Sequence, residues 1–167
     1  ILRRRGEVMI WTRGEELVTP AFPEVADAAM ALPEGSVLDG ELLAWGETGV
    51  LPFGRLQRRL GRKRVGARLL AQVPVRFLAY DLMEARGDDI RAHPIEERRR
   101  ALEALLTAHA PGAGGTGVLG LSPRVEVTGE GGWGELVELR RESRERGVEG
   151  LMLKRLGSPY RQGRPRG

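Results

Sequence analysis

A short segment near the end of the chain combines a carboxylate, an apolar run and two cations. Residues 147–155 are Gly-Val-Glu-Gly-Leu-Met-Leu-Lys-Arg. The apolar run 151–153 is too short for a helix and predicts a buried strand. A carboxylate at the mouth of such a strand is stabilised only by a cation, a metal or hydrogen-bond donors. Glu149 is therefore a candidate site residue, although glutamates at strand entrances are more often simply solvated.

A second pair of carboxylates lies in the segment Ser36 to Trp45, whose pattern predicts a strand. Strand alternation places Asp39 and Glu41 on the same face, in apolar surroundings. The alternative is a tight turn centred on Asp39-Gly40, because Asp-Gly is a frequent pair in type I′ hairpins. The residues alone leave both interpretations open.

The segment Val75 to Leu82 is a third element that carries candidate site residues. Its composition predicts a strand that ends in Tyr80-Asp81. Strict alternation puts these two side chains on opposite faces, so a purely structural role for Asp81 is also open.

The remaining pattern consists of short strands separated by helices. We expect a hairpin turn at 3–6 leading into a strand at 7–12, helices at 23–32, 53–60, 95–108 and 133–146, and strands at 118–121 and 124–127. This mixture favours an α+β fold.

The composition describes one soluble globular domain of 167 residues, with 41% hydrophobic and 30% charged residues. No apolar run approaches the roughly 20 residues of a membrane span, so we expect no membrane partner. The chain contains no cysteine and two histidines, which excludes thiolate zinc sites and histidine metal clusters. The lack of cysteine fits a cytoplasmic location.

Basic residues outnumber acidic ones, 27 to 23. All of the basic residues except Lys63 and Lys154 are arginines. Arginine binds phosphate with a planar fork, so nucleic acid is the leading partner, although a GC-rich genome also enriches arginine. A dense basic group lies in the expected helix 53–60 and continues into 61–64, where either phosphate contacts or a solvated face would relieve the repulsion between like charges. The DNA-binding candidates are Arg55, Arg58, Arg59, Arg62 and Lys63.

Taken together, these features resemble the motif series of ATP-dependent DNA ligases, and more broadly the covalent nucleotidyltransferases that include RNA ligases and mRNA capping enzymes. The series comprises Thr12-Arg13, Asp39-Gly40-Glu41, Phe77 to Asp81, and Glu149-Gly150 before Lys154. The stretches 19–24, 38–42, 60–64 and 147–155 favour the bacterial DNA ligases. The resemblance runs along essentially the whole chain.

The resemblance implies a role for each matched residue. Arg13 would contact the phosphate of the nucleotide or of the DNA 5′ end, and Glu41 would accept a hydrogen bond from the ribose. Tyr80 would stack on adenine, and Glu149 would bind the metal, with Asp39 beside it. Three of these, Glu41, Tyr80 and Glu149, are expected to converge on one ATP.

Two further residues belong to the same motifs. Asp81 matches the acidic residue next to the aromatic position. Lys154 matches the cation of the last motif and is expected to bind ATP, although alternation places it off the face of Glu149.

The resemblance also implies the architecture and the partners. It predicts an ATP-grasp-like core of two antiparallel sheets flanked by helices. The expected ligands are ATP, Mg²⁺ or Mn²⁺, and nicked double-stranded DNA. We expect a monomer that acts in DNA repair, replication or recombination.

The family nucleophile is a lysine in Lys-x-Asp-Gly, and neither Lys63 nor Lys154 begins such a tetrad. In the family the tetrad would lie just before Ile1, and a last lysine motif and an oligonucleotide-binding domain would follow Gly167. We therefore expect residues 1–167 to be an internal part of an adenylation domain, truncated at both ends and inactive in self-adenylation. The alternatives are a non-catalytic nucleic-acid-binding relative and an RNA ligase or capping-type enzyme.

Overall fold

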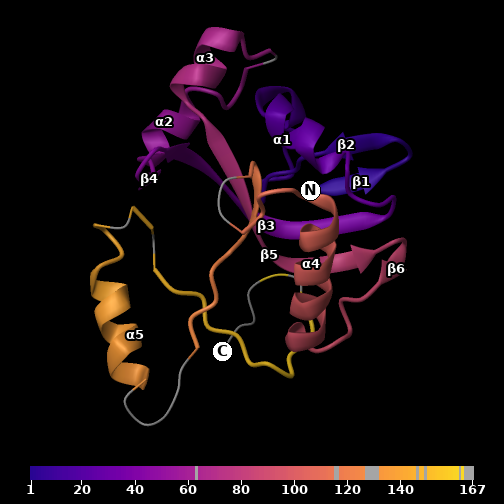
Figure 1. Ribbon diagram of the computed structural model, residues 1–167, viewed down its shortest axis with the longest axis vertical. Helices are drawn as coiled ribbons and strands as arrows, with labels where there is room; N and C mark the ends of the chain where they lie inside the picture. Colours follow the sequence, from indigo (N-terminus) through magenta and orange to yellow (C-terminus); the bar gives the residue numbers. More distant parts are fainter. Residues whose placement is uncertain are drawn as a thin grey trace.

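A mainly antiparallel sheet forms the centre of the molecule (Figure 1). The computed structural model describes residues 1–62, 64–114, 117–126, 132–145, 147–148, 150–161 and 163. Two long strands, β3 (Ser36–Gly46) and β5 (Val75–Ala85), pair antiparallel along most of their length. Both segments were expected to be strands, and both predictions are confirmed.

Shorter strands extend this pair on both sides, in the order β2-β1-β3-β5-β6. The hairpin of β1 (Leu2–Arg4) and β2 (Glu7–Met9) turns at Arg5 and Gly6, which both have positive φ. Three short strands complete the sheet: β4 (Gly49–Val50) beside β3, β6 (Asp88–Asp89) beside β5, and β7 (Leu119–Leu121) parallel to β5.

The helices cover the sheet and its ends. They are the 3₁₀ helix η1 (Thr19–Ala21), α1 (Pro23–Ala29), α2 (Phe53–Gln57), α3 (Ala67–Gln72), α4 (Ile95–His109) and α5 (Gly132–Arg141). Figure 1 shows α4 packed along β5, whereas α5 stands apart from the sheet. Leu102 and Leu106 of α4 are buried in the core against the sheet, as the amphipathic pattern predicted.

Gly40 decides between strand and turn at the Asp39-Gly40 pair. It lies inside β3, opposite Ala79, so the turn alternative is wrong. A Cβ atom at Gly40 would lie 2.6 Å from the Leu78 carbonyl oxygen and would also collide with the Phe77 ring. Glycine is therefore required here by close approach to the neighbouring strand.

The pairing of β3 with β5 contains an irregularity beside Tyr80. Asp39 pairs with Asp81 but the next residue, Gly40, pairs with Ala79, so Tyr80 has no residue opposite it. This is a β-bulge, which re-aims side chains and breaks strict alternation. The prediction that Tyr80 and Asp81 face opposite sides rested on alternation and therefore fails locally.

Two expected strands are absent from the part of the chain that is described. Residues 150–155 and 124–126 have no regular secondary structure. The described residues form one mainly antiparallel sheet, and the second sheet of the expected architecture is not seen among them. No described helix is long and apolar enough to cross a membrane.

Candidate functional site

A pocket of about 280 Å³ lies between β3, β5, the start of α4 and the final described segment. The segment 152–161 forms one wall. The lining residues are Arg13, Asp39, Tyr80, Asp81, Arg98, Met152, Lys154, Ser158, Pro159, Tyr160 and Arg161. The pocket thus combines two carboxylates, two phenols and several cations, which suits a ligand with both a planar ring and negative charge.

Two tyrosines hold the Asp39 carboxylate. The Tyr80 hydroxyl donates to Oδ1 at 3.1 Å, and the Tyr160 hydroxyl donates to Oδ2 at 3.0 Å. Burial and the adjacent Asp39 charge raise the pKa of both phenols, that of Tyr160 to about 12. Both hydroxyls therefore stay protonated at neutral pH and remain donors to Asp39.

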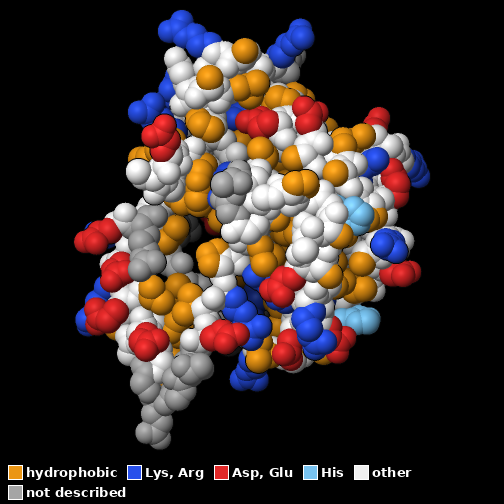
Figure 2. All heavy atoms as spheres, in the orientation of Figure 1, with side chains coloured by type: hydrophobic (Ala, Val, Ile, Leu, Met, Phe, Trp, Pro, Cys, Tyr) orange, Lys and Arg blue, Asp and Glu red, His pale blue; other side chains and the backbone are white. Residues whose placement is uncertain are grey.

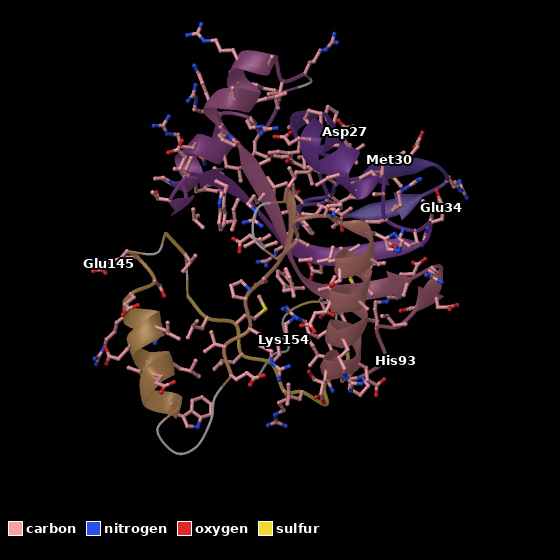
Figure 3. All side chains as sticks on the ribbon, viewed as in Figure 1. Asp27, Met30, Glu34, His93, Glu145 and Lys154 are labelled. Carbon is pink, nitrogen blue, oxygen red and sulfur yellow. The ribbon has the colours of Figure 1, made fainter. Side chains whose placement is uncertain are left out.

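Asp81, which is fully buried, is instead held by two cations. Arg98 donates through Nε and Nη2 to the two carboxylate oxygens at 2.8 and 2.9 Å. The Lys154 ammonium lies 3.3 Å from Oδ2 and 4.9 Å from the centre of the Tyr80 ring. Figure 3 shows Lys154 beside α4. The buried carboxylate thus orients a lysine over the face of the pocket tyrosine.

The segment that carries Lys154 and Tyr160 is fastened to the start of α4 by main-chain hydrogen bonds. The first two amides of the helix, Ile95 and Glu96, donate to the carbonyls of Ser158 and Leu156 at 2.9 and 3.2 Å. The Tyr160 amide donates to the Arg91 carbonyl at 2.8 Å. These bonds therefore hold residues 156–160, which follow the segment 151–153 that was expected to be a strand, against the start of α4.

Five of the residues singled out from the sequence line this pocket: Arg13, Asp39, Tyr80, Asp81 and Lys154. Glu41 does not. It lines a second hollow of about 120 Å³ with apolar residues of β3 and α2 and with Val148. Glu41 is two residues further along β3, towards β4, which takes it beyond the first pocket. The expected convergence of Glu41 with Tyr80 is therefore not observed, and Glu149 lies outside the described residues.

The basic group around α2 divides into exposed and buried members. Arg55, Arg58 and Arg62 are exposed, and Figure 2 shows blue side chains projecting from the α2–α3 end of the molecule. Lys63 lies outside the described residues. Arg59 is fully buried, so the prediction that it contacts DNA is wrong.

Arg59 instead joins three parts of the fold. Its guanidinium binds both carboxylate oxygens of Glu24 and the carbonyls of Ala21 and Val73. It also lies 4.9 Å from the centre of the Phe22 ring. With all its donors directed inward, Arg59 fixes α2 to the η1–α1 corner.

Two residues of the pocket, Arg98 and Tyr160, were not anticipated. The sequence does contain a pattern that indicates Arg98. This arginine continues the buried helical stripe of Leu102 and Leu106 at a spacing of four. An arginine in an apolar stripe requires a buried anion. Tyr160 lies in a Pro- and Gly-containing stretch without periodicity, and no pattern pointed to it.

Comparison with protein families gives a match over the whole chain. The model described as "ATP dependent DNA ligase domain" matches residues 1–167. A probable DNA ligase of Koribacter versatilis is 35% identical over an alignment of 173 residues that covers 96% of this chain and 30% of that protein. A DNA ligase of Haloferax volcanii is 35% identical over 160 residues, covering 95% and 26%. The chain thus spans less than a third of these two relatives.

Two solved structures have the same fold. One is the mycobacterial DNA ligase D complexed with ATP and MES, 28% identical, with a TM-score of 0.65, covering 96% of this chain and 46% of that one. The other is the ligase domain of LigD from M. tuberculosis, 26% identical, with a TM-score of 0.64, covering 95% and 45%. The mixed α+β fold agrees with both. This chain belongs to the ATP-dependent DNA ligase family, within its adenylation domain.

Proposed function

We propose that this chain binds ATP for a DNA ligase that seals nicks in double-stranded DNA. The observation that carries the proposal is the convergence of Arg13, Tyr80 and Lys154 on one pocket. The Tyr80 ring offers a surface on which adenine stacks, which contributes about 1–3 kcal/mol per base. The two cations stand at the same pocket and can neutralise phosphate oxygens.

The reaction proceeds in three transfers. A lysine attacks the α-phosphorus of ATP and pyrophosphate leaves. The adenylate then passes to the 5′-phosphate of the nick, and the 3′-hydroxyl displaces AMP. The 167-residue chain contains no Lys-x-Asp-Gly, so its part is to bind and orient the nucleotide. We propose that this chain alone does not label itself with AMP.

The metal remains a prediction. Asp39 offers a carboxylate at the pocket, but the described residues contain no group of three acidic or histidine side chains that could hold an ion. Glu149, the other expected ligand, lies outside them. The residues that are described do not by themselves form a site for Mg²⁺.

DNA contact is proposed for the exposed arginines of the α2 region, Arg55, Arg58 and Arg62. All three are exposed, and blue side chains project from the end of the molecule that carries α2 and α3 (Figure 2). Arginine side chains that project into solvent can reach phosphates while the fold keeps its internal hydrogen bonds, in contrast to Arg59.

A nick-sealing assay on the full-length protein tests the proposal. Duplexes with a single nick are prepared with DNA or RNA on the 3′ or the 5′ side, and the product is followed with and without ATP. We expect ATP-dependent sealing of the all-DNA nick and a protein–AMP adduct that survives denaturation. Sealing of RNA nicks only would favour the RNA ligase alternative, and DNA binding without adduct or sealing would favour a non-catalytic relative.

The 167-residue chain is tested in parallel with labelled ATP. We expect ATP binding without a covalent adduct. An adduct that survives denaturation would contradict the assignment of the nucleophile to a residue outside this sequence.

A further inference from the structure

We propose that Arg98 is a positioning residue that sets the segment 154–160 against the sheet and thereby places Lys154 and Tyr160 at the pocket. This inference rests on the proposed function, since it assigns the effect to ATP binding. Arg98 comes from the first turn of α4 and is 1% exposed.

The guanidinium of Arg98 contacts both walls of the pocket. On the sheet side, Nε and Nη2 bind Asp81, the neighbour of Tyr80, at 2.8 and 2.9 Å. On the segment side, Nη1 donates to the Ser158 carbonyl at 3.2 Å and also to the His93 carbonyl. One planar group thus links the strand that carries Tyr80 to the segment that carries Lys154.

The same guanidinium also lies next to the second pocket tyrosine. Its central carbon is 5.9 Å from the centre of the Tyr160 ring. The hydroxyl of that ring reaches Asp39 of β3 at 3.0 Å. Arg98 therefore packs near the ring of Tyr160, while Asp39 accepts a hydrogen bond from its hydroxyl.

The geometry requires arginine rather than any cation. From one rigid plane, Nε and Nη2 donate to the Asp81 carboxylate, while Nη1 donates to the carbonyls of His93 and Ser158. A lysine ammonium would keep the charge opposite Asp81 but cannot span the carboxylate and the Ser158 carbonyl at once. Lys154 already binds Asp81, so charge compensation alone does not explain Arg98.

The test compares two adjacent arginines of α4 in the full-length protein. Arg98→Lys keeps the charge and removes the fork. The matched control is Arg99→Lys, because Arg99 binds Glu103 and the Ser122 carbonyl and does not line the pocket. For both variants, the initial rate of protein–AMP formation is measured against ATP concentration, together with the melting temperature.

We expect Arg98→Lys to raise KM for ATP about tenfold, equivalent to about 1.4 kcal/mol, while Arg99→Lys leaves it within about twofold. A purely structural role would lower the melting temperature and the active fraction, and hence kcat, without changing KM. If KM is unchanged in Arg98→Lys, the inference is overturned.

Limited trypsin digestion provides a measurement that does not need activity. Cleavage after Lys154 and Arg155 reports release of the segment, and cleavage after Arg64 and Arg68 reports general loosening. We expect Arg98→Lys to accelerate cleavage after Lys154 and Arg155 about tenfold more than cleavage after Arg64 and Arg68. The reason is that local opening of the segment is governed by the contacts that hold it. If cleavage at the two pairs of sites is accelerated equally, the inference is overturned.

A second variant, on the other side of the same ion pair, covers the case in which Arg98→Lys does not fold. Asp81→Asn is isosteric and removes the charge that Arg98 and Lys154 share. We expect the same rise in KM and the same selective cleavage, and absence of both would overturn the inference. If the wild-type protein forms no AMP adduct, the proposed function fails, while the digestion still decides the role of Arg98.

Discussion

Asp39 and Asp81 lie directly opposite each other on β3 and β5, yet their carboxylates are held by different kinds of donor. Asp39 is bound by the hydroxyls of Tyr80 and Tyr160, and Asp81 by the cations of Arg98 and Lys154. Like charges opposite each other on paired strands are destabilising. Here the bulge beside Tyr80 and the two sets of donors relieve that repulsion and create a pocket with a phenolic side and a cationic side.

The first prediction concerns the Tyr80 ring. We expect Tyr80→Ala to weaken ATP binding to the chain by about 1–3 kcal/mol, since it removes the stacking surface. Tyr80→Phe keeps the ring and should bind nearly as well as wild type. Calorimetric titration with ATP measures both. Lys154→Ala should weaken binding less than Tyr80→Ala, and equal losses would contradict the stacking role.

The second prediction follows from the half-buried phenols of the pocket. The pKa of Tyr160 rises from 10.0 to about 12 in the folded protein, chiefly through burial. Above the ordinary pKa of tyrosine, the unfolded chain loses this proton while the folded chain keeps it. The stabilising contribution is therefore complete below pH 10 and is lost as pH rises towards 12.

Urea unfolding at a series of alkaline pH values measures this loss. The decline in the free energy of unfolding should be shallower in Tyr160→Phe, which has no proton to lose. Identical declines in the variant and the wild type would show that Tyr160 is not the group responsible.

The third prediction separates Arg59 from the exposed arginines. Arg59→Met leaves Glu24 without its buried partner and removes bonds to two carbonyls, so we expect a loss of about 3–5 kcal/mol in the free energy of unfolding. Arg55→Met, at an exposed position of α2, should change it by less than about 0.5 kcal/mol. Urea denaturation measures both. A small change in the free energy of unfolding for Arg59→Met would mean that the packing of α2 against η1 and α1 does not depend on Arg59.

The fourth prediction concerns DNA. Replacing Arg55, Arg58 and Arg62 together by Gln should weaken binding to nicked duplex and reduce the slope of log K against log salt by about 0.9 for each phosphate that is no longer neutralised. Fluorescence anisotropy at several salt concentrations measures the slope. The charge-matched control replaces exposed arginines of the α5 region, Arg140, Arg141 and Arg144. If the two triple variants change the affinity and the salt slope equally, the effect is one of overall charge rather than of a binding surface.

The sequence was sufficient for the long strands and for α4, because their patterns are strong and local. It failed where tertiary contacts override periodicity. Alternation separates Tyr80 from Asp81, but the bulge brings both to one pocket. A bulge depends on the register between two strands that are distant in sequence, and no local pattern reveals that register.

Charge patterns were a weaker guide to the site. Arg59 looked like its neighbours in a basic run, and only its position opposite Glu24 distinguishes it. The segment 150–155 has the composition of a strand, but its backbone contributes no strand pairing in the described structure. In both cases the deciding partner is supplied by another part of the chain.

The start of α4 is fully engaged by the protein itself. Helix N-termini commonly attract anions because their first amides are unpaired. Here the amides of Ile95 and Glu96 are occupied by carbonyls of the final segment, and those of Glu97 and Arg98 by the Pro94 carbonyl. If the pocket binds a triphosphate as proposed, the start of α4 offers it no free amide, and its charge would meet the side chains of Arg13 and Lys154 instead, so nucleotide affinity should fall steeply with ionic strength.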